Sequence, residues 1–331
     1  MNSRFQQILY LNILALTIIS FCLGCRQPSQ NKRVEEPLAK TTTSEHAFFK
    51  LSLAQWSLHK AIMEEKTMSA MAFAKNAKEM GFEGVEYVSQ LYKPEIEKMG
   101  MQRVLDSLLA ESDSQSIQNV LIMVDGEGDL ADTSVDDRDR AVENHKKWVD
   151  AAQFLGCHSI RVNTFGANEP NQWHNAVVDG LTKLSKYAAT KDINVLVENH
   201  GWLSSDADKL MAVISEVNLE NCGTLPDFGN FCVKRAEGAR WGECEEEYPD
   251  IYKGVELMME KAKAVSAKSY DFDNQGFETR LDYERLLKIV KQSGYRGFIG
   301  VEYEGDRLSE TEGIEATKNL LLSTAGKLQT N

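Results

Sequence analysis

From residue 48 onward the chain alternates between apolar runs and amphipathic segments. An apolar run without polar alternation is typical of a strand buried on both faces, as in a parallel sheet covered by helices. Such runs predict strands at 51–56, 84–88, 117–124, 159–163, 193–198, 224–227, 264–269 and 297–302. The periodicity between them predicts helices at 68–80, 97–109, 134–155, 171–190, 205–217, beyond residue 248, at 282–292 and at 309–328.

Alternating strand–helix pairs of this number predict a (β/α)8 TIM barrel, an α/β fold that would occupy residues 48–328 as a single domain. A doubly wound open sheet is the structural alternative, but no glycine-rich phosphate-binding loop follows the first strand. Because the carboxyl ends of barrel strands meet at one mouth, polar residues at these ends are candidates for an active site.

Three of the predicted strands end in a carboxylate. Glu198 follows the apolar run 193–197, Asp227 ends the sixth strand, and Glu302 ends the eighth. A single acid at a strand end is unremarkable, whereas three such acids separated by helical segments favour one shared site at the barrel mouth.

Composition narrows the classes of function. The 331 residues carry a net charge of −13, and 42% of them are hydrophobic, which is sufficient for one large domain. The negative charge argues against nucleic acid as a partner, because nucleic-acid binding requires a basic face. A serine hydrolase is disfavoured as well, since the chain has no Gly-x-Ser-x-Gly motif.

Residues 1–24 resemble a bacterial lipoprotein signal peptide. Arg4 precedes a short apolar segment at 8–21, and the Cys-Leu-Gly-Cys sequence that follows resembles a lipobox with an unusual first residue. We expect lipidation of Cys25 and a flexible tether at 25–47. The barrel would then be exported and anchored to a membrane on its periplasmic or cell-surface face. An uncleaved membrane anchor is the alternative, and it also places the barrel outside the cytoplasm.

The remaining cysteines are Cys157, Cys222, Cys232 and Cys244. An oxidising compartment allows a disulfide, and Cys232 and Cys244 are the pair that we expect because they share one predicted loop. Buried free thiols are the expectation for Cys157 and Cys222. The cysteine and histidine spacings do not match a zinc site.

The order of four motifs resembles the sugar phosphate isomerase/epimerase family with the xylose isomerase-like barrel. They are Val-Glu-Asn-His-Gly at 197–201, Pro-Asp-Phe-Gly-Asn at 226–230, Asp271 after the seventh strand, and Gly-Val-Glu-Tyr at 300–303. The resemblance covers nearly the whole domain. Each motif is weak alone, but their order and spacing together are specific.

The resemblance implies a divalent metal at the barrel mouth, held in that family by Glu, Asp, His and Glu from strands five to eight. Glu198, Asp227 and Glu302 match three of these ligands, and Mn, Mg, Co and Zn are the candidate ions. The metal would polarise a carbonyl and stabilise an enediolate. By the same resemblance, Glu198 and Glu302 would remove and return a proton on opposite faces of the adjacent carbon.

The sequence departs from the family at the fourth ligand, where Lys268 replaces the expected histidine. Three interpretations remain open. The metal binds through three protein ligands plus water, or Lys268 acts catalytically as a general base or an oxyanion-stabilising cation, or the metal is lost and Lys268 neutralises the carboxylates.

Other residues near strand ends are candidates for contact with a substrate. His200 lies two residues after Glu198, so both side chains share one face while the strand continues. The full set of expected substrate contacts is Trp56, Glu86, Arg161, His200, Asn230 and Tyr270. His158 is expected to be structural, and His145 and His174 are expected to face solvent.

The first functional hypothesis is a metal-dependent isomerase or epimerase that acts on a small sugar. The alternative enzyme is a lyase or dehydratase that acts on a keto-sugar or keto-glycoside, with the same proton abstraction followed by loss of a β-substituent. A non-catalytic surface sugar-binding lipoprotein is a third hypothesis, but a binding protein has no need for three converging acids. The sequence is also compatible with a homo-oligomer, because dimers are common for this architecture.

Overall fold

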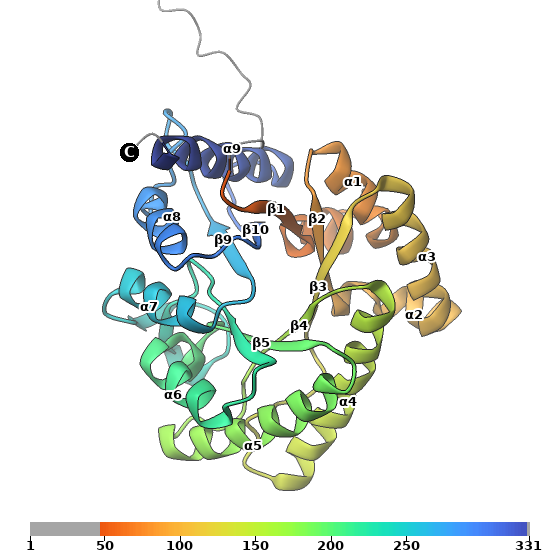
Figure 1. The fold of residues 1–331 in the computed structure, drawn as a ribbon, viewed down its shortest axis with the longest axis vertical. Coiled ribbons are helices and arrows are strands. Elements are labelled where there is room, and N and C mark those ends of the chain that lie inside the picture. Colours follow the sequence, from red (N-terminus) through yellow and green to blue (C-terminus); the bar gives the residue numbers. More distant parts are fainter. Residues whose placement is uncertain (1–46, 330–331) are drawn as a thin grey trace, which may run out of the picture. The chain divides into compact units, whose positions relative to one another are not determined.

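The computed structural model describes residues 47–329, and all but two of the strands in this part of the chain form one ring (Figure 1). Eight of these strands are parallel: β1 (Lys50–Ala54), β2 (Gly84–Val88), β3 (Gln118–Val124), β4 (Ser159–Val162), β5 (Asn194–Glu198), β6 (Cys222–Leu225), β9 (Val265–Ser269) and β10 (Phe298–Tyr303). Their order is β6-β5-β4-β3-β2-β1-β10-β9. The lipobox, the signal peptide and nearly all of the expected tether lie outside the described residues.

The ring closes between β6 and β9 through a short parallel bridge from Asp227 to Ser266. The Ser266 amide donates to the carbonyl of Pro226 (2.9 Å), and the Phe228 amide donates to the carbonyl of Ser266 (3.1 Å). The predicted TIM barrel is therefore confirmed. Asp227 lies just beyond the end of β6, so the chain segment that completes the ring also carries a candidate ligand.

Helices cover the outside of the strands, as the apolar runs predicted (Figure 1). They are α1 (Phe73–Glu79), α2 (Lys93–Met99), α3 (Met101–Gln115), α4 (Val135–Leu155), α5 (Pro170–Ala189), α6 (Ala207–Val217), α7 (Ile251–Met258), α8 (Tyr283–Gln292) and α9 (Glu310–Gln329). The strand run of Val195, Leu196 and Val197 is fully buried, which explains why it shows no polar alternation.

The helix predicted at 97–109 is two helices, because Gly100 adopts a φ of 87° between α2 and α3. A positive φ favours glycine and ends a helix, whereas the surrounding apolar pattern continues through it. The first helix is also shorter than predicted, since residues 70–72 form a separate 3-10 turn before α1.

The loop after β6 contains a two-stranded antiparallel hairpin of β7 (Cys232–Arg235) and β8 (Cys244–Glu247). A disulfide joins Cys232 to Cys244, as the sequence suggested, and Cys157 and Cys222 are buried free thiols. Within the part of the chain that the structure describes, no helix has the length and apolarity needed to cross a membrane.

Candidate active site

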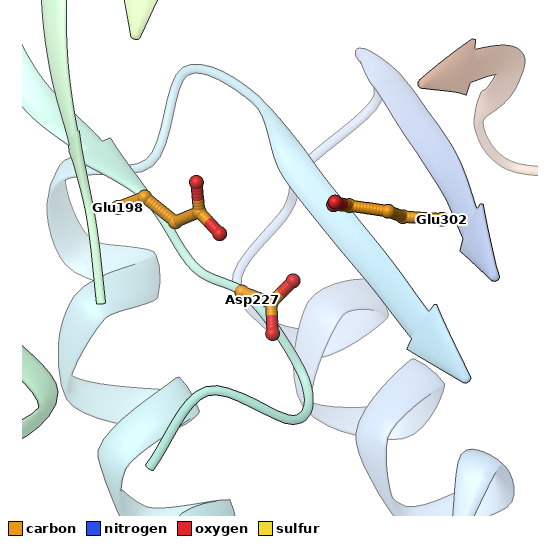
Figure 2. A group of neighbouring side chains, drawn as sticks. All are labelled: Glu198, Asp227 and Glu302. Carbon is orange, nitrogen blue, oxygen red and sulfur yellow. The ribbon is translucent and has the colours of Figure 1, made fainter. Parts of the chain in front are cut away.

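Three buried carboxylates converge at the carboxyl ends of the strands. Glu198 is the last residue of β5, Asp227 follows β6, and Glu302 lies in β10. One oxygen from each acid lies within 4.8 Å of the others. Figure 2 shows Glu198 and Glu302 pointing toward each other from opposite sides, with Asp227 between them. The structure therefore brings the three acids predicted from the sequence into one cluster.

The turn after β6 is built around Asn199 and the Asp227 backbone. The Asn199 side chain accepts a hydrogen bond from the Asp227 amide (2.7 Å) and donates to the carbonyls of Asp227 and Asn230 (3.0 Å each). The amides of Gly229 and Asn230 in turn donate to Asp227 Oδ1 (2.8 and 2.9 Å). A Cβ at Gly229 would lie 2.6 Å from the Tyr270 hydroxyl, so a larger residue there would displace Tyr270.

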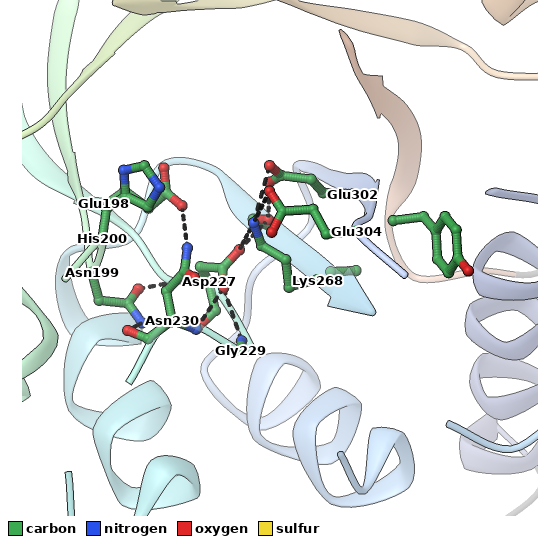
Figure 3. A network of polar contacts seen from close by, with 12 residues as sticks. Glu198, Asn199, His200, Asp227, Gly229, Asn230, Lys268, Glu302 and Glu304 are labelled. Carbon is green, nitrogen blue, oxygen red and sulfur yellow. Dashed lines mark hydrogen bonds and ion pairs between the residues drawn. The ribbon is translucent and has the colours of Figure 1, made fainter. Parts of the chain in front are cut away.

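Lys268 lies in β9, where the resemblance described above implies a histidine ligand. Its Nζ lies 3.1 Å from a carboxylate oxygen of Glu302, 3.1 Å from one of Glu304, and 3.9 Å from Asp227 (Figure 3). Burial alone would lower the pKa of Lys268, but these carboxylates outweigh burial and raise that pKa well above its ordinary value. The side chain is therefore a charged ammonium, which has no lone pair for metal binding or for general-base catalysis.

The negative charge of the three acids is not fully compensated by the Lys268 ammonium. Ser266 Oγ lies 2.6 Å from Asp227 Oδ2 and 2.9 Å from Glu302 Oε2, yet a hydroxyl has only one proton to donate. Burial raises the pKa of Asp227 well above its ordinary value, and the neighbouring Glu198 and Glu302 raise it further. The cluster therefore requires another cation or a proton between these carboxylates.

A polar chain links Glu198 of β5 to residues at the ends of the neighbouring strands β4 and β3. Arg161 Nε lies 2.8 Å from Glu198 Oε2, and its Nη1 lies 3.0 Å from Asp125 Oδ1. Burial raises the pKa of Glu198 to about 7, although Arg161 opposes this shift. Asn163 Nδ2 donates to Asp125 (2.6 Å), and Asn163 Oδ1 lies 2.7 Å from His200 Nδ1.

This chain fixes the proton on His200. Burial alone would raise the pKa of Asp125, but the nearby Arg161 outweighs burial and lowers that pKa. The Asp125 carboxylate can therefore only accept a hydrogen bond here. Asn163 must therefore direct its amide group to Asp125 and its carbonyl oxygen to His200, so that Nδ1 of His200 carries the proton. Burial, reinforced by Arg161 and Lys268, lowers the pKa of His200 to about 4, which leaves Nε2 as a lone-pair acceptor.

A cavity of about 1030 Å³ opens over the acids. Of the expected substrate contacts, five line it, and Glu302 lines it as well. These five are Trp56, Arg161, His200, Asn230 and Tyr270. Glu198 and Asp227 lie behind this surface with almost no exposure, and Asn230 Nδ2 donates to Glu198 Oε1 (2.9 Å).

Glu86 lies deeper in the barrel than the other candidates. It is 1% exposed, and it accepts a hydrogen bond from Ser52 Oγ (2.6 Å). A Cβ at Gly300, two residues before Glu302, would lie 2.5 Å from its carboxyl oxygen. Glu86 therefore lies one layer of side chains below the triad.

His145 corrects an expectation from the sequence, because it is 3% exposed rather than solvent-facing. Its Nδ1 lies 2.7 Å from the Ala141 carbonyl, and its ring lines the cavity. Helical position alone did not reveal that this face of α4 turns toward the mouth. His174, by contrast, pairs with Glu216 at the surface.

Two acids of the site were missed by sequence reasoning. Glu304 lies two residues after Glu302 in the last strand, and alternation along a strand places such residues on the same face. Asp125 follows the apolar run of β3 directly, which is the same signal that identified Glu198. Both acids could therefore have been found by applying the strand-end argument to every strand.

A profile of the xylose isomerase-like TIM barrel family matches residues 74–323. The chain therefore belongs to that family. No curated protein is similar enough in sequence to count as a match.

Solved structures share the fold at low sequence identity. The apo 3-keto-D-glucoside 4-epimerase YcjR from E. coli is 15% identical, with a TM-score of 0.63 over 83% of this chain and 99% of that chain. An L-ribulose 3-epimerase is 12% identical, with a TM-score of 0.65 over 85% and 97%. A xylose isomerase-like TIM barrel protein from Mycobacterium smegmatis in complex with magnesium is 15% identical, with a TM-score of 0.58 over 84% and 98%.

The donor set of the site can be tested against the divalent metal that the family implies. Three carboxylates within 4.8 Å suit a hard cation, and the single proton of Ser266 leaves one carboxylate contact without a donor. Glu304 gives the Lys268 ammonium a partner outside the triad. Glu198, Asp227 and Glu302 would therefore fit a divalent ion as three protein ligands.

Proposed function

We propose that this chain is a metal-dependent sugar isomerase or epimerase that moves a proton at the carbon next to a carbonyl. The observation that carries this proposal is the placement of Glu198 and Glu302 on opposite sides of the mouth, with Asp227 between them (Figure 2). Solved proteins of the same fold are named as epimerases of a keto-glucoside and of a ketose, which supports a sugar as the substrate.

Polar groups around the cavity would orient the sugar. His200 offers an unprotonated Nε2 to a substrate hydroxyl, because Asn163 holds its Nδ1 (2.7 Å). Asn230 binds Glu198 through its amide group, so its contact fixes the carboxylate next to the reacting carbon. Arg161 holds the other oxygen of Glu198 from the β4 side. The base is thus positioned by two partners before substrate binds.

The proton transfer needs one ionised and one protonated glutamate. The ionised glutamate takes the proton from the carbon, and the electron pair of that C–H bond forms the double bond of the enediolate. The protonated glutamate returns its proton to the opposite face and forms the new C–H bond, so the centre is inverted; Glu198 is the base in one direction of the reaction and Glu302 in the other. When bound by the triad, a divalent ion such as Mg²⁺, Mn²⁺, Co²⁺ or Zn²⁺ supplies Lewis-acid polarisation of a carbonyl oxygen.

Lys268 acts on this step through its neighbours. Its ammonium holds Glu302 and Glu304, both of which line the cavity, while its own side chain is 1% exposed. We therefore assign Lys268 as a positioning residue for Glu302.

Solvent-deuterium exchange tests this proposal directly. The chain is incubated in D₂O with keto-sugars and with each of the four candidate ions, and deuterium at the carbon next to the carbonyl is read by NMR. We expect exchange in the wild-type chain that disappears in Glu198→Gln. Absence of exchange with every ketose and every ion would overturn the proposal.

The second candidate function is a lyase that acts on a keto-glycoside, and the extent of the cavity supports this candidate. The cavity reaches beyond the triad to Trp241, so it has room for a substituent at the carbon β to the carbonyl. A lyase would take the same proton with Glu198 and then expel the substituent. Release of a free alcohol or sugar, measured together with exchange, separates the two reactions.

We also propose that the chain is an exported lipoprotein anchored through Cys25. The Cys232–Cys244 disulfide supports this, because such bonds persist in oxidising compartments outside the cytoplasm. Mass spectrometry of the mature amino terminus tests the proposal. A diacylglyceryl group on Cys25 supports it, and an intact terminus at Met1 overturns it.

A further inference from the structure

One wall of the cavity is aromatic, and part of it lies on the disulfide-bonded hairpin. The hairpin strands β7 and β8 are joined by the Cys232–Cys244 bond, which spans 12 residues of sequence. The segment between the strands brings Arg240 and Trp241 to the cavity. These two residues come from a loop, whereas the acids of the triad come from the barrel strands or their immediate ends.

The tip of the hairpin is fixed to the barrel by several contacts. Arg240 forms an ion pair with Asp129, which lies in the loop between β3 and α4. The Arg240 guanidinium also lies over the rings of Phe165 (5.0 Å) and Trp202 (5.9 Å). Trp202 Nε1 donates to the Ala239 carbonyl (2.9 Å). The tip therefore has a defined position above the mouth.

Trp241 presents an open aromatic face in this arrangement. Its ring packs edge-on to Phe165 (5.5 Å between centroids) and lies 5.0 Å from the ring of His200, yet the residue remains 56% exposed. A tryptophan that is packed on one side and lines a cavity on the other retains apolar area that a ligand can cover. The apolar C–H face of a sugar ring has the shape and chemistry for that contact.

His200 places this aromatic wall next to the acids. Its sequence position is two residues after Glu198, and its ring touches both Phe165 and Trp241. A sugar ring held at the triad and a ring stacked on Trp241 would therefore be neighbours along the cavity. A volume of about 1030 Å³ exceeds the need of one sugar ring and is at the upper end of ligand pockets.

We propose that Trp241, Phe165 and Arg240 form a subsite for the second ring of a glycoside, so that the substrate is a keto-glycoside with two rings rather than a free monosaccharide. This inference rests on the proposed function, because it assigns the first ring to the triad. The Arg240 guanidinium adds hydrogen-bond donors for hydroxyls at the edge of the second ring. The disulfide keeps the hairpin closed and thereby holds Trp241 over the cavity.

The test compares the affinities of the full-length chain for 3-keto-D-glucose and for the 3-keto derivatives of cellobiose and maltose, measured by calorimetry. Wild type should bind at least one disaccharide more tightly than the monosaccharide. Trp241→Ala should lower the ratio of disaccharide to monosaccharide affinity about tenfold, and Trp241→Phe should retain most of that ratio. Phe154→Ala is the matched control, since Phe154 is an exposed aromatic residue (40%) on α4, and its ratio should equal that of wild type.

A variant without the disulfide provides an independent test. Cys232→Ser combined with Cys244→Ser should reduce the same affinity ratio, because the hairpin then no longer holds Trp241 in place. A wild-type chain without preference for either disaccharide, or a Trp241→Ala variant with an unchanged ratio, would overturn the subsite.

Deuterium exchange on the same ligands separates the two proposals. If deuterium exchange proceeds but the affinity ratio is the same in wild type and Trp241→Ala, the subsite is contradicted and the proposed function stands. If Trp241→Ala lowers the affinity ratio but no deuterium exchange occurs, the proposed function is contradicted and the subsite stands.

Discussion

One buried acid, Glu86, lies below the triad of buried acids in this barrel, and the two sites differ in the partners of their carboxyl groups. Glu86 has the hydroxyl of Ser52 as its hydrogen-bond donor, and burial raises its pKa to about 8. The triad one layer above is equally buried, but the cations Lys268 and Arg161 contact its members directly. Burial without a cation in direct contact thus raises the pKa of Glu86, whereas in the triad Arg161 and Lys268 oppose the effect of burial on the pKa values of Glu198 and Asp227. Charge compensation, more than depth, separates the structural acid from the chemical ones.

The largest effect is expected when the chemistry of the triad is removed. Glu198→Gln keeps the shape of the side chain and its contact with Asn230, but it cannot accept the substrate proton. We expect the exchange rate to fall about 10³-fold, within the usual contribution of a general base. Exchange kinetics in D₂O measure this. Glu216→Gln, on the surface of α6, is the control and should keep the wild-type rate; a Glu198→Gln rate within a few fold of wild type would contradict the assignment.

A smaller effect is expected when the triad loses its cation. Lys268→Met leaves Glu302, Glu304 and Asp227 without the ammonium that they share, and an unpaired buried charge is costly. We expect the free energy of unfolding to fall by about 3 kcal/mol in urea titrations near neutral pH. Lys183→Met removes an exposed lysine paired with Asp139 and Asp179, and its loss should be about 0.5 kcal/mol. Equal losses in the two variants would show that Lys268 does not compensate buried charge.

The smallest effect is expected at Glu86, where Glu86→Gln imitates the protonated acid. The pKa of Glu86 is raised from 4.5 to about 8, chiefly by burial, with Glu302 and Glu198 adding to the rise and Ser52 and Arg161 opposing it. The raised pKa means that its stabilisation is complete below pH 4.5 and is lost as pH rises through about 8.

Glu86→Gln should therefore have nearly wild-type stability at about pH 5 and greater stability than wild type at about pH 9. Urea unfolding at the two pH values measures this difference. An identical offset between variant and wild type at both pH values would show that Glu86 is ionised throughout.

The sequence predicted the fold and the triad because both follow from local patterns. Apolar runs such as 193–197 identify buried strands, and the acids at their ends mark the mouth. Helix boundaries were less accurate, since Gly100 interrupts a continuous apolar pattern through its backbone conformation. The resemblance to a family added the pairing of Glu198 with Glu302, which strand patterns alone do not give.

Other features depend on contacts between distant segments and could not be read from the sequence. The bridge of Ser266 between two carboxylates requires the closure of the ring at β6 and β9. The partners of Lys268 required knowledge of where β10 places Glu304. The position of Trp241 depends on the hairpin and on the ion pair between the neighbouring Arg240 and Asp129 of the β3–α4 loop. Arg240 and Asp129 are 111 residues apart in sequence.

The central claim, that the triad holds a divalent ion despite Lys268, is tested most directly by the metal content of the purified chain. We predict about one Mn, Mg, Co or Zn ion per chain by mass spectrometry of the metals, and loss of that ion in Glu198→Gln. The thermal unfolding temperature should rise when the preferred ion is added to the metal-free chain. A chain that contains no metal and gains no stability from any of the four ions would contradict the claim and leave Lys268 as the cation of the site.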